Sequence, residues 1–448
     1  DVLAAIAGGK CFDDDCTQDT TLTSRNRAVA RMLQGMALAG IALMYDSGFA
    51  VDETSDLSDP LNIPFNSRAQ MRDFAVQKLS QAAAEAGDLS MDWETGDNWF
   101  GLEGGATYTN VQIAQLAHTA AAELIALWPR NATENAAADW AAVLTHASQG
   151  ISSTTAFDFE YFIDINAAEC GLACIKTWGN SIGTMRVDTR VAAMITSNHS
   201  DPWPNPGGNP CPTISADRRV GNGGWGPSNN FNGYSTIKAD SNSGSDYACS
   251  AVAIFPPARG QYHQSNLQHV RYNHLAYTGE RLPGFDGSGQ DPLYTREMND
   301  LLWAEALLRS GGSKVTAANL INNSRVGRGG AGCATPGVGG CGLLPLTGAE
   351  TDTAMYDALH YEQEIEFMGQ GTDPFFNRRR AGSLTTGTPR QMPVPAKEMD
   401  VLVREIYTFG GPGQPDMSPA AVTGRVRSVG QIFNDYRHMA RMLGSSKR

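Results

Sequence analysis

The chain has 448 residues, of which 41% are hydrophobic and 18% charged, and its formal net charge is −13. This composition is typical of a globular protein with a sizeable core, and we expect residues 1–448 to form a single domain. Because the negative charge repels nucleic-acid phosphates and anionic lipid surfaces alike, we expect no nucleic-acid partner.

Apolar residues recur at helical spacing through residues 24–150, which predicts an N-terminal part built from amphipathic helices. The short link between the last two of these helices indicates a helical hairpin. Thr23 or Ser24 is expected to cap the first helix, and Gly87 to end the second. In chain order the predicted helices are Ser24 to Asp46, Ser67 to Ala86, Thr109 to Leu127 and Glu134 to Gln149.

Residues 151–293 are rich in glycine, asparagine, proline and serine, with turn signals every few residues. We therefore predict a loop-rich insertion with short strands, such as Ala251 to Phe255, and one brief helix at Thr189 to Ser197. It is the candidate ligand region.

Helical spacing returns in residues 294–448. The recurring helix–turn–helix units predict a mainly α-helical, tetratricopeptide-like solenoid that carries the insertion. The predicted helices of this C-terminal part are Tyr294 to Arg309, Val315 to Arg325, Asp352 to Met368 and Val426 to Leu443.

The eight cysteines are neighbours in the sequence, which predicts four local disulfides. No pair has the two-residue gap of a zinc knuckle and the histidines are scattered elsewhere, so disulfides are favoured over metal half-sites. Disulfides persist in oxidising compartments, and we therefore predict an exported protein. The pairs are Cys11–Cys16, Cys170–Cys174, Cys211–Cys249 and Cys333–Cys341.

Four segments between about residue 25 and residue 400 carry distinctive motifs. The first is the helical run RAVARMLQGMALAGIALMYD. The segment MNDLLWAEALLRSGGSKVTAANLINNSRVGR has an Ala-Glu-Ala centre at Glu305 and an Asn-x-x-Arg ending at Arg325. LHYEQEIEFMGQGTDPFFNRRRAG carries the glutamates Glu362 and Glu366 before Arg378, and MPVPAKE follows it. In this order the segments resemble the first conserved helix, the later helices and the C-terminal Ile-Pro-x-x-Glu of the SusD/RagB family of outer-membrane nutrient-binding lipoproteins.

The resemblance implies a non-enzymatic surface protein that captures oligosaccharides, or other polymer fragments such as peptides, for a SusC-type TonB-dependent transporter. Family members carry upstream helices and a lipidated cysteine, so we expect that an N-terminal segment is missing here. The high cysteine content and the basic final helix depart from the family pattern, which leaves the role of that helix and the partner interface open.

The same resemblance implies that Glu305, Glu362 and Glu366 are structural carboxylates paired with arginines such as Arg325, Arg378 or Arg379. General acid–base catalysis is the alternative, but it needs two carboxylates in one open cleft, and no spacing in the sequence places them there. The chain also lacks a GxSxG, HExxH or phosphate-loop motif.

Aromatic side chains in the insertion are the candidate ligand-binding residues, because sugars present flat apolar faces that stack on tryptophan and tyrosine. The alternative is that they fill small local cores beneath loops, and we expect Trp128, Trp140 and Trp303 on the helices to be core residues. The candidates are Trp203, Trp225, Phe231 and Tyr234 with the polar partners Asp217, Arg218, Asn229 and Asn230, and a second cluster at Trp93 and Trp99.

Two oxygen-rich runs have the alternating ligands that suit calcium, one of them formed by Asp240, Asn242 and Asp246. Neither run has the terminal glutamate of an EF-hand, so solvated turns are favoured and we predict no cofactor, with calcium as the alternative. The alternative function is a structural subunit of an extracellular filament or surface layer, which self-association into polymers would distinguish.

Overall fold

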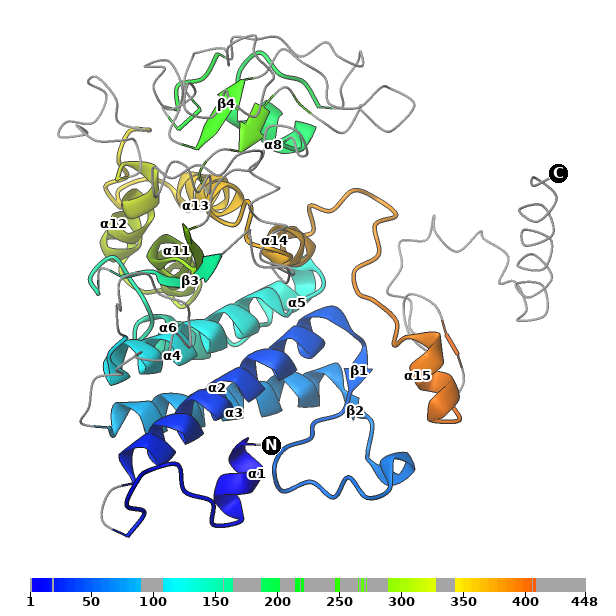
Figure 1. The fold of residues 1–448 in the computed structure, drawn as a ribbon. Coiled ribbons are helices and arrows are strands. Elements are labelled where there is room, and N and C mark those ends of the chain that lie inside the picture. The colour runs from blue at the N-terminus through cyan, green and yellow to red at the C-terminus, as the bar shows by residue number, and fades with distance from the viewer. Residues whose placement is uncertain are drawn as a thin grey trace, which may run out of the picture.

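The computed structural model describes residues 2–17, 20–89, 108–155, 157–163, 187–201, 214–217, 219–220, 246–249, 265, 267–269, 271, 289–327, 343–404 and 406–407. Over these residues the fold is mainly helical, as predicted, with a few short strands (Figure 1). None of the described helices is long and apolar enough to cross a membrane.

Two long helices, α2 (Thr21–Met44) and α3 (Arg68–Gly87), lie side by side at the N-terminal end of the fold (Figure 1). The short strand β1 (Ser47–Gly48) follows α2 and pairs antiparallel with β2 (Asn66–Ser67), which leads into α3. This pairing brings the end of α2 next to the start of α3, so the two helices run antiparallel. A 3₁₀ turn at Pro60–Asn62 lies between the strands, and α1 (Val2–Ala7) precedes α2.

Helices α3 and α4 (Asn110–Leu127) begin where the sequence predicts, because both have a capping box. The side chain of Ser67 accepts a hydrogen bond from the main-chain amide of Gln70, and the side-chain oxygen of Gln70 accepts one from the main-chain amide of Ser67. Thr109 and Gln112 form the same pair of bonds at the start of α4. Each box satisfies two main-chain amides that the first helical turn leaves without partners.

The single helix predicted at Glu134 to Gln149 is wrong, since the chain forms α5 (Ala132–Ala136) and then α6 (Trp140–Ala147). The carboxylate of Asp139 accepts a hydrogen bond from the amide of Ala142 at 2.9 Å, which starts a new helix in the middle of the predicted one. Aspartate favours this capping geometry over a helix interior.

The described C-terminal part contains three of the four predicted helices together with two that were missed. Tyr294 belongs to a strand rather than to the next helix, which starts after Thr295. The helix predicted at Val426 to Leu443 lies outside the described residues. The observed helices are α11 (Arg296–Arg309), α12 (Lys314–Arg325), α13 (Asp352–Glu366), α14 (Asp373–Ala381) and α15 (Ala396–Val401), of which α14 and α15 were not predicted.

The described residues of the insertion have the predicted short strands and one short helix. Strand β3 (Phe159–Ile163) pairs antiparallel with β6 (Gly289–Tyr294), so the entry and exit of the insertion lie together. Further along, β4 (Tyr247–Cys249) pairs with β5 (Leu267–His269), next to α8 (Thr189–Ile195). The strand predicted at Ala251 to Phe255 lies outside the described residues.

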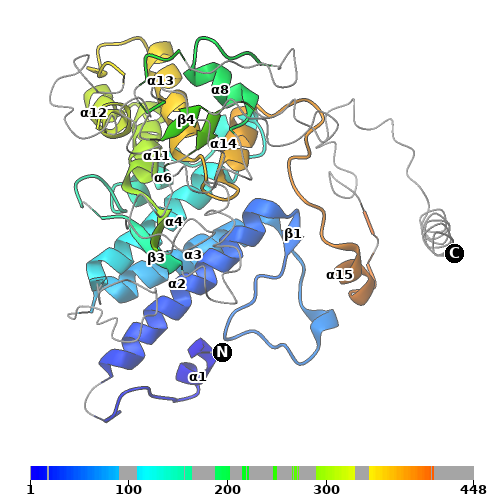
Figure 2. The ribbon, with the colours of Figure 1, turned by 45° about the horizontal axis from the view of Figure 1, so that its top comes forward.

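Hydrophobic contacts connect the helices in layers from α2 to α13. The layers are α2 with α3 and α4, then α4 with α6 and α11, then α11 with α12 and α13. The insertion packs on the last of them, where Tyr247 and Leu267 lie against Ile365 of α13. Figures 1 and 2 both show α8 and β4 next to α13, so the described part of the insertion rests on the helical frame.

Candidate functional site

A buried ion-pair network fastens the insertion to helices α12 and α13. Its centre is Arg219, which is 0% exposed and lies between two carboxylates. The guanidinium donates to Asp217 at 2.7 Å and to Glu362 of α13 at 2.5 Å. Burial opposes the charge on Arg219, yet Glu362 and Asp217 outweigh it and hold the pKa of Arg219 well above its usual range. Both the insertion and the frame therefore contribute to one charge cluster.

Glu366 extends the same cluster by one helical turn of α13. Arg271 of the insertion forms an ion pair with Glu366. The Ser324 hydroxyl of α12 lies 2.6 Å from a Glu366 oxygen and 3.0 Å from a Glu362 oxygen, so it can donate to either carboxylate. Arg325, one of the arginines that the resemblance implied as partners of these glutamates, adds a contact to Glu362 at 3.3 Å.

The carboxylate of Asp217 is committed to this network and is not free to bind a ligand. It is 2% exposed and also accepts a hydrogen bond from the Tyr361 hydroxyl at 2.8 Å. The sequence placed Asp217 among the polar partners of a ligand, whereas the structure gives it an anchoring role.

A second buried network, around Glu305, joins α11, α13 and α14. Arg380 donates to both carboxylate oxygens, at 2.8 and 2.7 Å, and Arg309 adds a third bond at 2.7 Å. Gln363 donates to the same carboxylate at 2.8 Å. Burial would raise the pKa of Glu305, but the guanidinium of Arg380 outweighs it and lowers that pKa, so Glu305 is held as an anion.

Two arginines suggested as partners of these glutamates bind elsewhere. Arg378 pairs with Glu364 at 2.6 Å. Arg379 donates to the main-chain carbonyls of Leu43 at 2.7 Å and Leu127 at 2.9 Å, which are the C-terminal ends of α2 and α4. Consecutive helical residues point in different directions, so only one of the three arginines in a row can face Glu305.

Nearly all of the predicted ligand residues lie outside the described part of the chain, and so do most of the predicted disulfides. Asp246 is described and is buried beside β4, whereas the other two residues of that calcium run are not described. Cys249 is described only as part of β4. Outside the described residues lie Trp93, Trp99, Trp203, Arg218, Trp225, Asn229, Asn230, Phe231, Tyr234, Asp240, Asn242, Cys170, Cys174, Cys211, Cys333 and Cys341.

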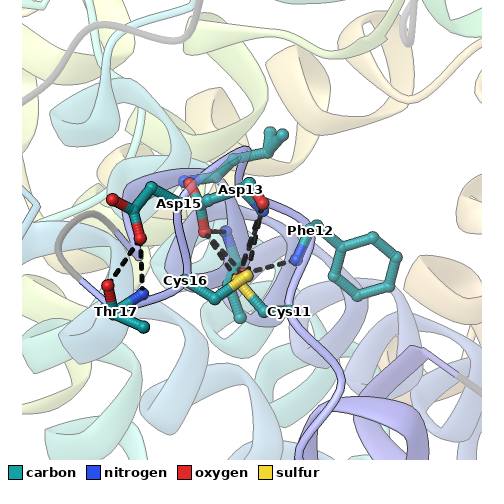
Figure 3. The surroundings of a disulfide bond; sticks show 8 residues. Cys11, Phe12, Asp13, Asp15, Cys16 and Thr17 are labelled. Atoms are coloured by element: carbon teal, nitrogen blue, oxygen red, sulfur yellow. Dashed lines mark hydrogen bonds between the residues drawn. A yellow bond between two sulfur atoms is a disulfide. The ribbon is translucent and has the colours of Figure 1, made fainter.

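The disulfide between Cys11 and Cys16 is present, and the loop that it closes caps helix α2 (Figure 3). Asp13 of this loop accepts hydrogen bonds from the amides of Leu22 at 2.6 Å and Thr23 at 3.0 Å. The residue before the helix makes no side-chain capping bond of its own. A carboxylate next to the first-turn amides also interacts favourably with the positive end of the helix dipole.

Trp128, which was expected to be a core residue, packs against the hydrophobic core but is only partly buried. It follows the last residue of α4, is half-buried and lines a surface recess of about 580 Å³. The guanidinium carbons of Arg68 and Arg72 lie 3.8 and 4.2 Å from its ring centroid. Of the other two, Trp140 is buried as predicted, whereas Trp303 is only partly buried.

The signal that could have identified this recess is the Trp128-Pro129 pair. A proline directly after the tryptophan ends the helix there, so Trp128 stands at the C-cap of α4, where a side chain can be partly exposed.

Comparison with solved structures identifies this fold. A SusD-like protein from Bacteroides fragilis superposes with a TM-score of 0.50 at 13% identity, covering 85% of this chain and 72% of that protein. A SusD homolog from Bacteroides thetaiotaomicron gives 0.49 at 12% identity, with 88% and 80% covered. Surface glycan-binding protein A from Bacteroides uniformis gives 0.45 at 14% identity, with 91% and 76% covered.

Neither a known protein family nor a curated protein matches the sequence. The chain therefore has the SusD-like fold, as the ordered motifs predicted, and the likeness at this identity concerns the fold alone.

Proposed function

We propose that this protein is a non-catalytic surface binding protein that captures oligosaccharides through the aromatic residues of its insertion. The observation that carries the proposal is the SusD-like fold, in which Arg219 and Arg271 fasten the insertion to the helical frame. A scaffold held in this way lowers the entropy that a binding surface loses when it engages a ligand.

The chemistry of the insertion supports a sugar more than other polymer fragments. Its sequence combines Trp203, Trp225 and Tyr234 with a high density of asparagine, and aromatic faces with amide and hydroxyl partners suit sugar rings. The buried carboxylates of Glu305 and Glu362 are each engaged by arginines, which suits a structural role better than acid–base catalysis.

We also propose that the protein acts at the outer-membrane surface and delivers its ligand to a SusC-type TonB-dependent transporter. Purification of the native protein in mild detergent tests this partner. A discrete complex with a large membrane protein is the expected result. Ordered polymers without such a partner would instead support the alternative of a filament or surface-layer subunit.

A glycan array tests the binding proposal directly. Trp203→Ala and Trp225→Ala are each expected to weaken binding by about fivefold or more, since one stacked ring contributes roughly 1–3 kcal/mol. The matched control is Leu61→Ala, which removes an exposed apolar side chain from a turn outside the insertion. Unchanged binding by both tryptophan variants would remove them from the site, and a wild-type chain that binds no glycan would refute the proposal.

A further inference from the structure

The surface recess beside Trp128, which we call the Trp128 recess, lies on the helical frame and not on the insertion. Its described lining residues come from α3, from the end of α4 and from the segment that contains α5 and α6. Its volume of about 580 Å³ is within the range of roughly 300–1,000 Å³ that is typical of small-molecule sites. The chemistry of the lining therefore indicates which ligand the recess suits.

Apolar side chains form a large part of the recess. Val76 of α3 and Ile125 of α4 line it, together with three alanines of the α5–α6 segment. Trp128 adds an aromatic ring, and its Nε1 atom donates a hydrogen bond to the main-chain carbonyl of Arg68 at 3.3 Å, which holds the ring in place. The guanidinium groups of Arg68 and Arg72 lie against the same ring, so aromatic and charged groups are fixed next to one another.

The charged side chains of the described lining each have a counterpart within the protein. Arg68 forms an ion pair with Glu134, and Arg72 forms one with Asp73. Asp139 accepts a hydrogen bond from a first-turn amide of α6 at 2.9 Å, where the helix dipole also favours a carboxylate. An ionic ligand would compete at each of these groups with a partner that is already present. The recess therefore suits a neutral ligand.

The rim of the recess nevertheless has hydrogen-bonding capacity. The guanidinium of Arg72 directs its Nε and Nη2 atoms to a single oxygen, Oδ1 of Asp73. Within the described part of the chain, Nη1 of Arg72 and Oδ2 of Asp73 make no hydrogen bond, and the Asp73 side chain is 66% exposed. A hydroxyl group both donates and accepts, so it can bond to either group without breaking the ion pair.

A sugar ring matches this combination, because it has an apolar face and hydroxyl groups at its edge. We propose that the Trp128 recess binds a segment of a neutral oligosaccharide, as a second subsite apart from the insertion. This inference rests on the proposed function for its class of ligand, and it adds a site on the helical frame. Contact with the ligand comes from the apolar lining, from Trp128 and from the rim groups of Arg72 and Asp73.

Fluorine NMR of the full chain labelled with fluorotryptophan tests the proposal. The chain has 8 tryptophans, and single substitutions such as Trp128→Phe assign their resonances. The probes are cellohexaose, mannohexaose and xylohexaose, and at least one of them is expected to shift the Trp128 resonance. Hexagalacturonate is expected to bind no more tightly than these neutral probes, because the charges of the recess are already paired.

Two variants of the recess, each with a matched control, show where the probe binds. Ala142→Phe puts a ring into the recess and is expected to weaken binding by about tenfold or more, because the ring occupies the space of the ligand. Ala141→Phe is its control, since Ala141 is exposed on the same helix. In case the filled recess does not fold, Arg72→Ala should weaken binding by about tenfold, because a hydrogen bond to a charged donor is lost. The exposed Gln77→Ala on α3 is the control for that variant.

The recess and the insertion give separate signals in this experiment. The absence of a shift at Trp128 would overturn the inference, and shifts at Trp203 or Trp225 in the same titration would leave the proposed function intact. Unchanged affinity in both Ala142→Phe and Arg72→Ala would also overturn it, and so would tighter binding of hexagalacturonate. A Trp128 shift that both variants weaken would establish the recess as a binding site even if the insertion gave no signal.

Discussion

Arg219 is one of the side chains that attach the insertion to the helical frame. Its guanidinium is fully buried and bonds to carboxylates from two separate segments, Asp217 and Glu362. Removal of one partner from a buried ion pair is costly because it leaves the other charge without compensation.

Arg219→Met is therefore expected to lower the free energy of unfolding by about 3–5 kcal/mol. Denaturant unfolding followed by circular dichroism measures the change. The control is the surface pair of Lys314 and Asp352, in which the aspartate side chain is 83% exposed, and Asp352→Asn should cost less than about 1 kcal/mol. Equal effects of the two substitutions would contradict the role given to Arg219.

His118 and His146 form a second residue-scale feature, with their Nδ1 atoms 3.0 Å apart. Burial, and then the neighbouring His146, lower the pKa of His118 from 6.5 to about 4. The unfolded chain therefore binds more protons than the folded chain between these two values. The contribution of His118 is fully present above about pH 6.5 and is lost as the pH falls toward 4.

We expect His118→Gln to be less sensitive to acid over this range than the wild type. Unfolding free energies measured at several pH values between 4 and 7 give the two slopes, and their difference isolates His118 from the carboxylates, which titrate in both proteins. Parallel slopes would show that the histidine pair does not respond to pH in this way.

Helix α2 contains a pair of glycines that test packing at the scale of an element. A Cβ atom at Gly35 would lie 2.7 Å from the Cγ atom of Leu79 on α3, whereas one at Gly40 would meet nothing within 4 Å. The two glycines are on the same helix but have opposite surroundings.

Gly35→Ala is expected to destabilise the protein by about 1–3 kcal/mol because α2 and α3 must move apart. Gly40→Ala is expected to stabilise it by up to about 1 kcal/mol, since alanine is the better helix former. Thermal unfolding of the two variants measures both effects, and each variant serves as the control for the other. A loss of stability in both would mean that α2 tolerates no added methyl group.

The loop closed by Cys11 and Cys16 supplies the cap that helix α2 lacks. Asp13→Ala should cost about 1 kcal/mol of stability, as for other lost caps, because two first-turn amides lose their acceptor. The neighbouring Asp14 is exposed, and Asp14→Ala is the matched control with little expected effect. Hydrogen exchange of the first turn of α2 locates the change, and equal exchange in the two variants would argue against the cap.

The sequence predicts an element well where its signals are local. Ser67 and Thr109 predict where α3 and α4 begin because a capping box involves residues only three positions apart. The cap of α2 was missed because it comes from Asp13, several residues upstream in a disulfide loop. The break that Asp139 makes in a predicted helix was missed because the apolar spacing continues across it.

At the scale of the whole molecule, the sequence identifies the buried glutamates but not most of their partners. The family motif singled out Glu305 and Glu362 as structural carboxylates. Their main partners, Arg380 and Arg219, are 75 and 143 positions away in the chain, and no local spacing reveals a contact over such a separation.

The ion pairs that fasten the insertion to α13 predict which part of the molecule opens first when they are broken. Glu366→Gln removes the charge that faces Arg271, at a contact between the insertion and α13. We expect amide exchange in residues 187–201 and 246–249 to become about tenfold faster or more. The free energy of local opening depends on the contacts that a region makes with the rest of the fold. Exchange in α3 and α4 should stay as it is, because these helices pack in a different layer.

Arg380→Met provides the matched comparison, because it breaks the network around Glu305 between α11, α13 and α14 instead. This variant should increase exchange in those helices more than in the insertion. If both substitutions accelerated exchange everywhere to the same extent, the two networks would stabilise one cooperative unit and the insertion would have no separate anchor. Distinct patterns would establish that Glu366 fastens the insertion locally while the helical frame remains folded beneath it.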